Sequence, residues 1–96
     1  IKQIFCDIWV PNAFTPNGDG VNDELRVLGN TGRLEQFHFY VYNRWGQLVF
    51  ETTDRSKGWD GRQQGVEAPG GTYVYMLEYK FHGQSILSKG NVTLLR

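Results

Sequence analysis

The sequence predicts an all-β fold, an antiparallel immunoglobulin-like β-sandwich of about seven strands. Short segments in which apolar and polar residues alternate are separated by clusters of Gly, Pro, Asn and Asp, which is the pattern of strands joined by turns. No segment shows the periodicity of an amphipathic helix, and the 12 glycines are spread along the chain. The 96 residues match one domain, whose three Trp, five Tyr and six Phe suffice for a packed core.

Composition and charge exclude several classes of function. The formal net charge is zero, so the chain lacks the basic footprint of a nucleic-acid-binding or membrane-binding domain. No apolar run approaches the roughly 20 residues that a membrane-spanning helix needs. The chain begins directly in a strand-like run without a signal peptide, and we expect it to be part of a longer protein. Cys6 is the single cysteine; it alternates with Ile4 and Ile8 and is expected to be a buried thiol.

The first half of the chain contains four predicted strands. Residues 4–10 alternate loosely and form the first, and residues 25–28 form a short second one after a long polar loop. The strongest strand signal lies at residues 37–42, where two Phe and a Val alternate with a His and two Tyr. Residues 43–47 (NRWGQ) predict a hairpin turn, and residues 48–51 return as the partner strand.

The second half predicts two long strands. Residues 52–71 have no useful periodicity, and we expect Trp59 to anchor this long loop against the core through its large apolar ring. Residues 72–81 alternate again, and after a His-Gly turn residues 84–96 form the last strand, with Gly90 as a candidate bulge. The expected core face of the first of these strands carries Tyr73, Tyr75, Leu77 and Tyr79. Because no cysteine pair joins the sheets, aromatic packing must do so.

A polar loop at residues 11–25 (PNAFTPNGDGVNDEL) is dense in Asn, Asp and Gly, and two interpretations of it stay open. In the first, its oxygen atoms hold calcium, since their spacing resembles the first half of a calcium-binding loop. The ligands would be Asn17, Asp19, the Val21 carbonyl and Asp23. In the second, the carboxylates and amides bond backbone N–H groups in Asx-turns. The calcium pattern is incomplete, because Leu28 stands where such a loop carries its bidentate Glu.

Nothing in the sequence predicts an enzyme, and no cofactor other than calcium is expected. His38 and His82 are far apart in the chain, and the serines lack the Gly-x-Ser-x-Gly pattern of a nucleophile elbow. No carboxylates are placed as an acid–base pair. Asp60 is expected to accept backbone N–H groups in a tight turn, and an ion pair between Arg44 and Asp60 is a further option.

Five segments, taken in their order and spacing, resemble a known family. They read PNAFTPNGDGVND at residues 11–23, YNRWGQLVF at 42–50, GWDG at 58–61, PGGTYVY at 69–75 and GNVTLLR at 90–96. Together they resemble the gliding-motility-associated C-terminal domain, which is the type B carboxy-terminal domain of cargo proteins exported by the bacterial type IX secretion system. The motif residues for which we expect a structural role are Arg44, Trp45, Gly46, Trp59, Asp60, Gly61, Gly71 and Tyr73.

The resemblance implies a folded C-terminal signal that directs its parent protein across the outer membrane to the cell surface or the medium. It implies partners among the outer-membrane components of the type IX system, including a PorP/SprF-like protein, and it makes Arg96 the expected end of the parent. We expect recognition to use exposed hairpins and the terminal strand, because an edge strand offers unpaired N–H and C=O groups. That strand comprises Gly90, Asn91, Val92, Thr93, Leu94, Leu95 and Arg96.

Two other functions remain as alternatives. The first is a carbohydrate-binding or adhesin-type module of a surface protein, which requires a row of coplanar exposed aromatic rings; the exposure of Trp9, Trp45 and Trp59 tests it. The second is a structural spacer in a tandem array, which requires further chain after residue 96.

Overall fold

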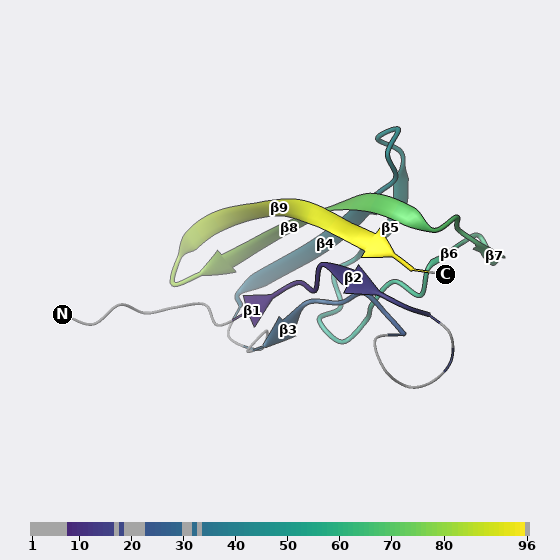
Figure 1. Ribbon diagram of the computed structural model, residues 1–96. Helices are drawn as coiled ribbons and strands as arrows, with labels where there is room; N and C mark the ends of the chain where they lie inside the picture. The colour runs from purple at the N-terminus through teal and green to yellow at the C-terminus, as the bar shows by residue number, and fades with distance from the viewer. Residues whose placement is uncertain (1–7, 17, 19–22, 30–31, 33, 96) are drawn as a thin grey trace.

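The computed structural model describes residues 8–16, 18, 23–29, 32 and 34–95. This part of the chain contains nine strands (Figure 1). The strands are β1 (Ile8–Trp9), β2 (Ala13–Phe14), β3 (Leu28–Gly29), β4 (Gln36–Tyr42), β5 (Leu48–Thr52), β6 (Arg62–Gln63), β7 (Val66–Glu67), β8 (Gly71–Phe81) and β9 (Gln84–Leu94). One sheet has the order β2-β9-β8-β4-β5, β1 pairs with β3, and β6 pairs with β7. The all-β prediction is confirmed. This part of the chain contains no helix long and apolar enough to cross a membrane.

Three long strands, β4, β8 and β9, are the frame of the large sheet. β8 pairs antiparallel with β9 along its whole length and antiparallel with β4 on its other side. In β4 the alternation seen in the sequence becomes burial, since Phe37, Phe39 and Val41 are buried and the residues between them are half-buried. β8 and β9 are joined by His82 and Gly83, whose φ values of 51° and 77° are those of a type I′ hairpin turn.

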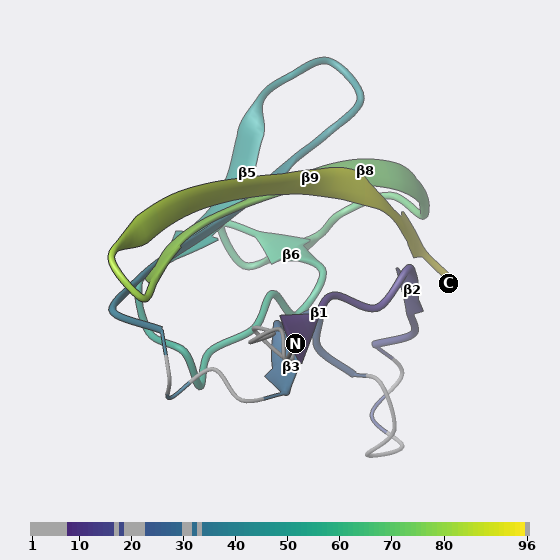
Figure 2. The same cartoon turned by 90° about the vertical axis from the view of Figure 1, so that its left-hand side faces the viewer.

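A second, thinner layer covers the core face of this sheet (Figure 2). It contains the β1–β3 pair and the segment around Trp59, which exchanges backbone hydrogen bonds of 2.8 and 2.9 Å with Leu25. Trp59 is 1% exposed, and its ring lies 5.5 Å from that of Phe14 and 4.9 Å from that of Tyr73, measured between centroids. The buried core comprises Phe14, Leu25, Val27, Leu34, Phe37, Phe39, Val41, Trp59, Ala68, Tyr73, Leu77, Phe81, Val92 and Leu94. Aromatic packing therefore joins the two layers.

Two features identify the sandwich as immunoglobulin-like. The strand order β9-β8-β4-β5 corresponds to the G-F-C-C′ order of a variable-type immunoglobulin sheet. At the start of β8, the Tyr73 hydroxyl donates a hydrogen bond of 2.6 Å to the backbone carbonyl of Pro69, a short way upstream in the chain. This contact is the tyrosine corner that recurs in such folds. The predicted immunoglobulin-like sandwich is confirmed.

Two details of the long strands and loops differ from the prediction. Gly90 is not a bulge, because β9 stays in register with β8 throughout. A register shift occurs instead in the pairing of β4 with β5, between Val41 and Tyr42. A Cβ atom at Gly90 would lie 2.6 Å from the ring of Tyr75, so the glycine makes room for that ring. Residues 52–71, predicted as a loop, contain the β6–β7 hairpin. Both of its strands are exposed, so no alternation of apolar residues marked them in the sequence.

The predicted strands near the N-terminus are also shorter than expected. Leu25 makes only an isolated bridge with Trp59, and β3 begins at Leu28. Of the first predicted strand, Ile8 and Trp9 form β1, whereas Cys6 lies outside the described residues.

Candidate recognition surfaces

The β4–β5 hairpin projects beyond the rest of the sheet, and its turn is fixed by Asn43 (Figure 2). The side-chain oxygen of Asn43 accepts the backbone N–H groups of Trp45 at 2.9 Å and Gln47 at 3.0 Å. Its amide nitrogen donates to Oε1 of Gln47 at 2.8 Å, and Gly46 completes the turn with a φ of 81°. Trp45, at the tip, is 73% exposed. The turn therefore presents a large apolar side chain on a well-ordered hairpin.

Arg44 lies beside Trp45 and Gly71. Its guanidinium carbon is 5.2 Å from the centroid of the Trp45 ring, which is the geometry of a cation–π contact. A Cβ atom at Gly71 would come within 3.1 Å of Nη2 of Arg44, and the φ of Gly71 is 142°, so both space and backbone favour glycine there. Arg44 does not pair with Asp60: Oδ1 of that residue accepts the backbone N–H of Arg62 at 3.0 Å instead.

Trp59, Asp60 and Gly61 hold the long loop to the core. The indole N–H of Trp59 donates to the carbonyl of Arg62 at 2.8 Å. Gly61, with a φ of 80°, accepts the backbone N–H of Ala68 at 2.8 Å. These bonds turn the chain from the buried Trp59 into the exposed β6–β7 hairpin, so the motif has a structural role.

The terminal strand is not the open edge that the sequence suggested. β2 runs parallel to its end: the backbone N–H of Thr93 donates to Asn12 at 2.9 Å, and that of Leu95 donates to Phe14 at 3.0 Å. Val92 is 0% and Leu94 1% exposed. Of the other residues expected to bind a partner here, Gly90 faces Tyr75, Asn91 is exposed, and Arg96 lies outside the described residues. The end of β9 is therefore covered, and the accessible part of its edge lies at the residues of β9 that precede Thr93.

The predicted calcium loop is described only in part. Asn17, Asp19 and Val21 lie outside the described residues, whereas Oδ1 of Asp23 accepts the backbone N–H of Gly18 at 3.0 Å. That bond belongs to the second interpretation of the loop, in which carboxylates bond the backbone. No group of three or more His, Cys, Asp or Glu side chains within the described residues is arranged to hold a metal ion. Calcium binding stays a prediction.

The outer face of the large sheet carries a stack of rings along β4. The ring of His38 lies 4.1 Å from that of Tyr40 with 13° between the planes, and Tyr42 follows at 6.2 Å and 19°. Nearly parallel rings that follow one another along a strand shield each other's faces, so this stack is not a flat platform for sugars. Trp59 is buried, and the exposed Trp9 and Trp45 lie on β1 and on the β4–β5 hairpin. The three tryptophans therefore form no common row.

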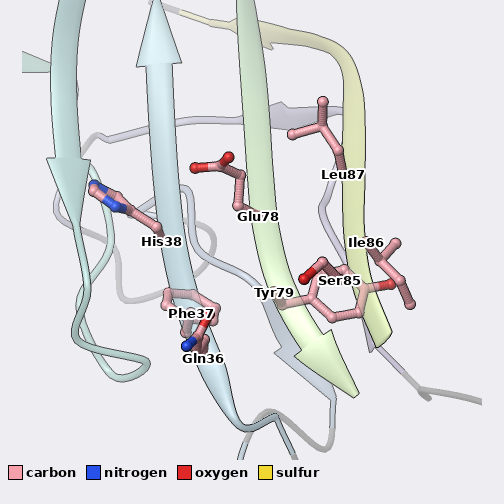
Figure 3. Close-up of a pocket in the computed structure, with 8 residues that line it drawn as sticks. All are labelled: Gln36, Phe37, His38, Glu78, Tyr79, Ser85, Ile86 and Leu87. Atoms are coloured by element: carbon pink, nitrogen blue, oxygen red, sulfur yellow. The ribbon is translucent and has the colours of Figure 1, made fainter. Parts of the chain in front are cut away.

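Carboxylates flank the ring stack on both sides. Nε2 of His38 lies 2.8 Å from Oε2 of Glu51, and the Tyr40 hydroxyl donates to Oε1 of Glu78 at 2.7 Å. The bond to Glu78 is the main cause that raises the pKa of Tyr40 to about 12, because an ionised phenol has no proton left to donate to it. Figure 3 shows His38, Glu78 and Leu87 around one hollow of about 350 Å³. His38 and Tyr40 of β4 thus bond Glu51 and Glu78 on the two neighbouring strands, and these bonds have a structural role.

Together these features define a class of protein: a small immunoglobulin-like sandwich whose distinctive accessible features are a projecting hairpin and a sheet edge. The chain belongs to the CHU_C type IX secretion signal domain family, whose model matches residues 8–94. No curated protein and no solved structure gave a significant match. The family assignment confirms the resemblance and the function inferred from it. The domain is a sorting signal for export across the outer membrane by the type IX system; its family is not a catalytic one, and it interacts with the secretion machinery.

Proposed function

We propose that a PorP/SprF-like outer-membrane protein recognises the folded surface of this domain, with the tip of the β4–β5 hairpin as a principal contact. The parent protein then reaches the cell surface or the medium. The observation that carries the proposal is the exposure of Trp45 on a turn that Asn43 holds by three side-chain hydrogen bonds.

Physical chemistry favours this tip as a binding anchor. Trp and Arg are the side chains most often found at the energetic centres of interfaces, and here Arg44 lies against the ring of Trp45. Burying a ring of roughly 200 Å² at about 25 cal/mol per Å² supplies on the order of 5 kcal/mol before the costs of association. Because the turn is already ordered by Asn43, little conformational entropy is lost when it docks.

The experiment is an export assay with a matched control. Residues 1–96 are fused to a fluorescent reporter that a signal peptide delivers to the periplasm of a bacterium with a working type IX system. Trp45→Ala is compared with Val66→Ala, since Val66 is a 69% exposed apolar side chain on the β6–β7 hairpin. Thermal unfolding checks that both variants fold.

We expect Trp45→Ala to lower the exported reporter and its co-purification with the PorP/SprF-like protein by about tenfold or more. Val66→Ala should leave both unchanged. Equal export and co-purification of a folded Trp45→Ala variant would show that the hairpin tip is not the contact.

A further inference from the structure

The hairpin register fixes which backbone groups of β9 point away from the sheet. Because β8 and β9 are joined by a type I′ turn, the pair Phe81–Gln84 that closes it exchanges hydrogen bonds, and bonded pairs recur at every second residue. Even-numbered residues of β9 therefore direct their N–H and C=O groups toward β8, and odd-numbered ones direct them away. The outward bonds from the N–H groups of Thr93 and Leu95 agree with this assignment.

Within the described residues, β2 covers only the end of this edge. β2 pairs with Thr93 and Leu94, and two residues before it stands Pro11, which has no N–H to continue a ladder. The chain then passes to β1, whose partner is β3 in the other layer. In Figure 1, β9 runs well past β2. The outward N–H and C=O groups of Ser85, Leu87 and Lys89 thus line an edge that no other described strand pairs.

A hollow of about 270 Å³ lies on the core side of β9, between it and β1. It is lined by Ile8, Trp9, Val10, Tyr75, Leu77, Tyr79 and Ser88, and most of the surface that these residues expose to it belongs to polar atoms. Ser88 is the β9 residue that lines the hollow, and the ring of Tyr75, which also lines it, lies over Gly90. Trp9, on its rim, is 55% exposed. The open backbone edge and the hollow therefore lie next to each other.

We infer that the edge of β9 at residues 85–91 accepts an extended strand from the type IX machinery. An added strand is the ligand that satisfies donors and acceptors repeated at every second residue, and strand addition to an open edge is a common mode of peptide recognition. Side chains on its inner face would enter the hollow beside Trp9 and Tyr75. A carboxylate on its outer face would complement Lys89. The inference rests on the proposed reading of the folded domain by a protein partner.

The edge is also unlike those that proteins protect from pairing. β9 has no proline and keeps its register with β8 along its whole length, whereas the opposite edge strand β5 is short and lies beside the register shift at Val41. Bulges, prolines, short strands and charged side chains such as Lys are the usual means of blunting an edge. Of these the described β9 carries only Lys89, so most of its length stays suited to pairing.

Proline at position 87 tests the edge without touching the β8–β9 ladder. The Leu87 N–H points outward, so Leu87→Pro removes a donor from the open edge and leaves the bonds to β8 intact. Leu87→Ala is the matched control, because it removes the same side chain and keeps the N–H. Both are measured in the export assay and by co-purification with the PorP/SprF-like protein, after thermal unfolding has shown that they fold.

We expect Leu87→Pro to lower export by about tenfold and Leu87→Ala to leave it within about twofold. If Leu87→Pro does not fold, Ser88→Phe replaces it, since the larger side chain fills the hollow, and the same loss is expected. Normal export of a folded edge variant would overturn the inference. So would a dimer of the isolated domain that only Leu87→Pro disrupts, because the edge would then serve self-association. Normal export of Trp45→Ala, together with loss of export in the edge variant, would reject the hairpin contact and support the β9 edge as the binding site.

Discussion

Gly90 gives the most demanding test of the packing. An added Cβ atom would lie 2.6 Å from ring atoms of Tyr75, which is closer than real Cβ contacts come, so Gly90→Ala must displace that ring. Tyr75 is half-buried and lies 6.2 Å from Phe39 between ring centroids, so its displacement loosens core packing. Overpacking of this kind costs about 1–3 kcal/mol. For a domain of this size each 1 kcal/mol lowers the Tm by roughly 4–8 °C.

A double-mutant cycle separates this cause from an ordinary glycine effect. In a Tyr75→Ala background the ring is gone, and Gly90→Ala should then be neutral or stabilising by about 0.4–1 kcal/mol, because alanine reduces the entropy of the unfolded chain. The free energies of unfolding come from urea titrations of the four proteins. If Gly90→Ala costs the same with and without Tyr75, the ring contact is not the reason for the glycine.

Three further predictions concern single side chains. Tyr73→Phe removes the bond to Pro69 and should destabilise the domain by about 1–2 kcal/mol in urea titrations, whereas a smaller change than about 0.5 kcal/mol would deny the tyrosine corner a stabilising role. Folding favours the neutral form of Tyr40, whose pKa is raised from 10.0 to about 12. The contribution of Tyr40 to the free energy of unfolding is therefore fully present below pH 10 and is lost as the pH rises through 12. Glu78→Gln should weaken that loss, and an unchanged tyrosinate titration would contradict the assigned cause. If the loop at residues 11–25 binds calcium, added CaCl₂ should raise the Tm and Asp23→Asn should abolish the rise; no rise in the unaltered protein would favour hydrogen-bonded turns.

Local patterns in the sequence predicted the strands that have one buried face. The alternation at Phe37, Phe39 and Val41, and again at Tyr73 and Leu77, has the period of a strand, and burial follows it in the structure. Turns whose residues have positive φ were equally visible, as at Gly46 and Gly83.

Features that depend on distant partners were not predictable in this way. Parallel pairing of β2 with Thr93 joins the two ends of the chain, and it moves the accessible edge of β9 away from the terminal residues. The fit of Tyr75 over Gly90 crosses two strands, so the glycine suggested a bulge. The register of β9, in contrast, follows from the two-residue turn at His82 and Gly83, so the sequence of that turn is sufficient to identify the outward backbone groups.

The structure also changes how the signal should be tested. Removing residues 90–96 would take Val92 and Leu94, 0% and 1% exposed, out of the core. Such a truncation tests folding and not recognition. Variants at exposed positions, such as Trp45 and Leu87, separate the two.

The most direct test of the central claim is export of the reporter fused to residues 1–96, compared between a strain with a working type IX system and a strain without it. We expect the folded fusion to reach the surface or the medium only in the first strain. Trp59→Ala leaves a large cavity in the core, so it should lower export as the folded fraction falls. Retention of the folded fusion in the periplasm of the competent strain, with the PorP/SprF-like protein present, would contradict the role of this domain as a sorting signal.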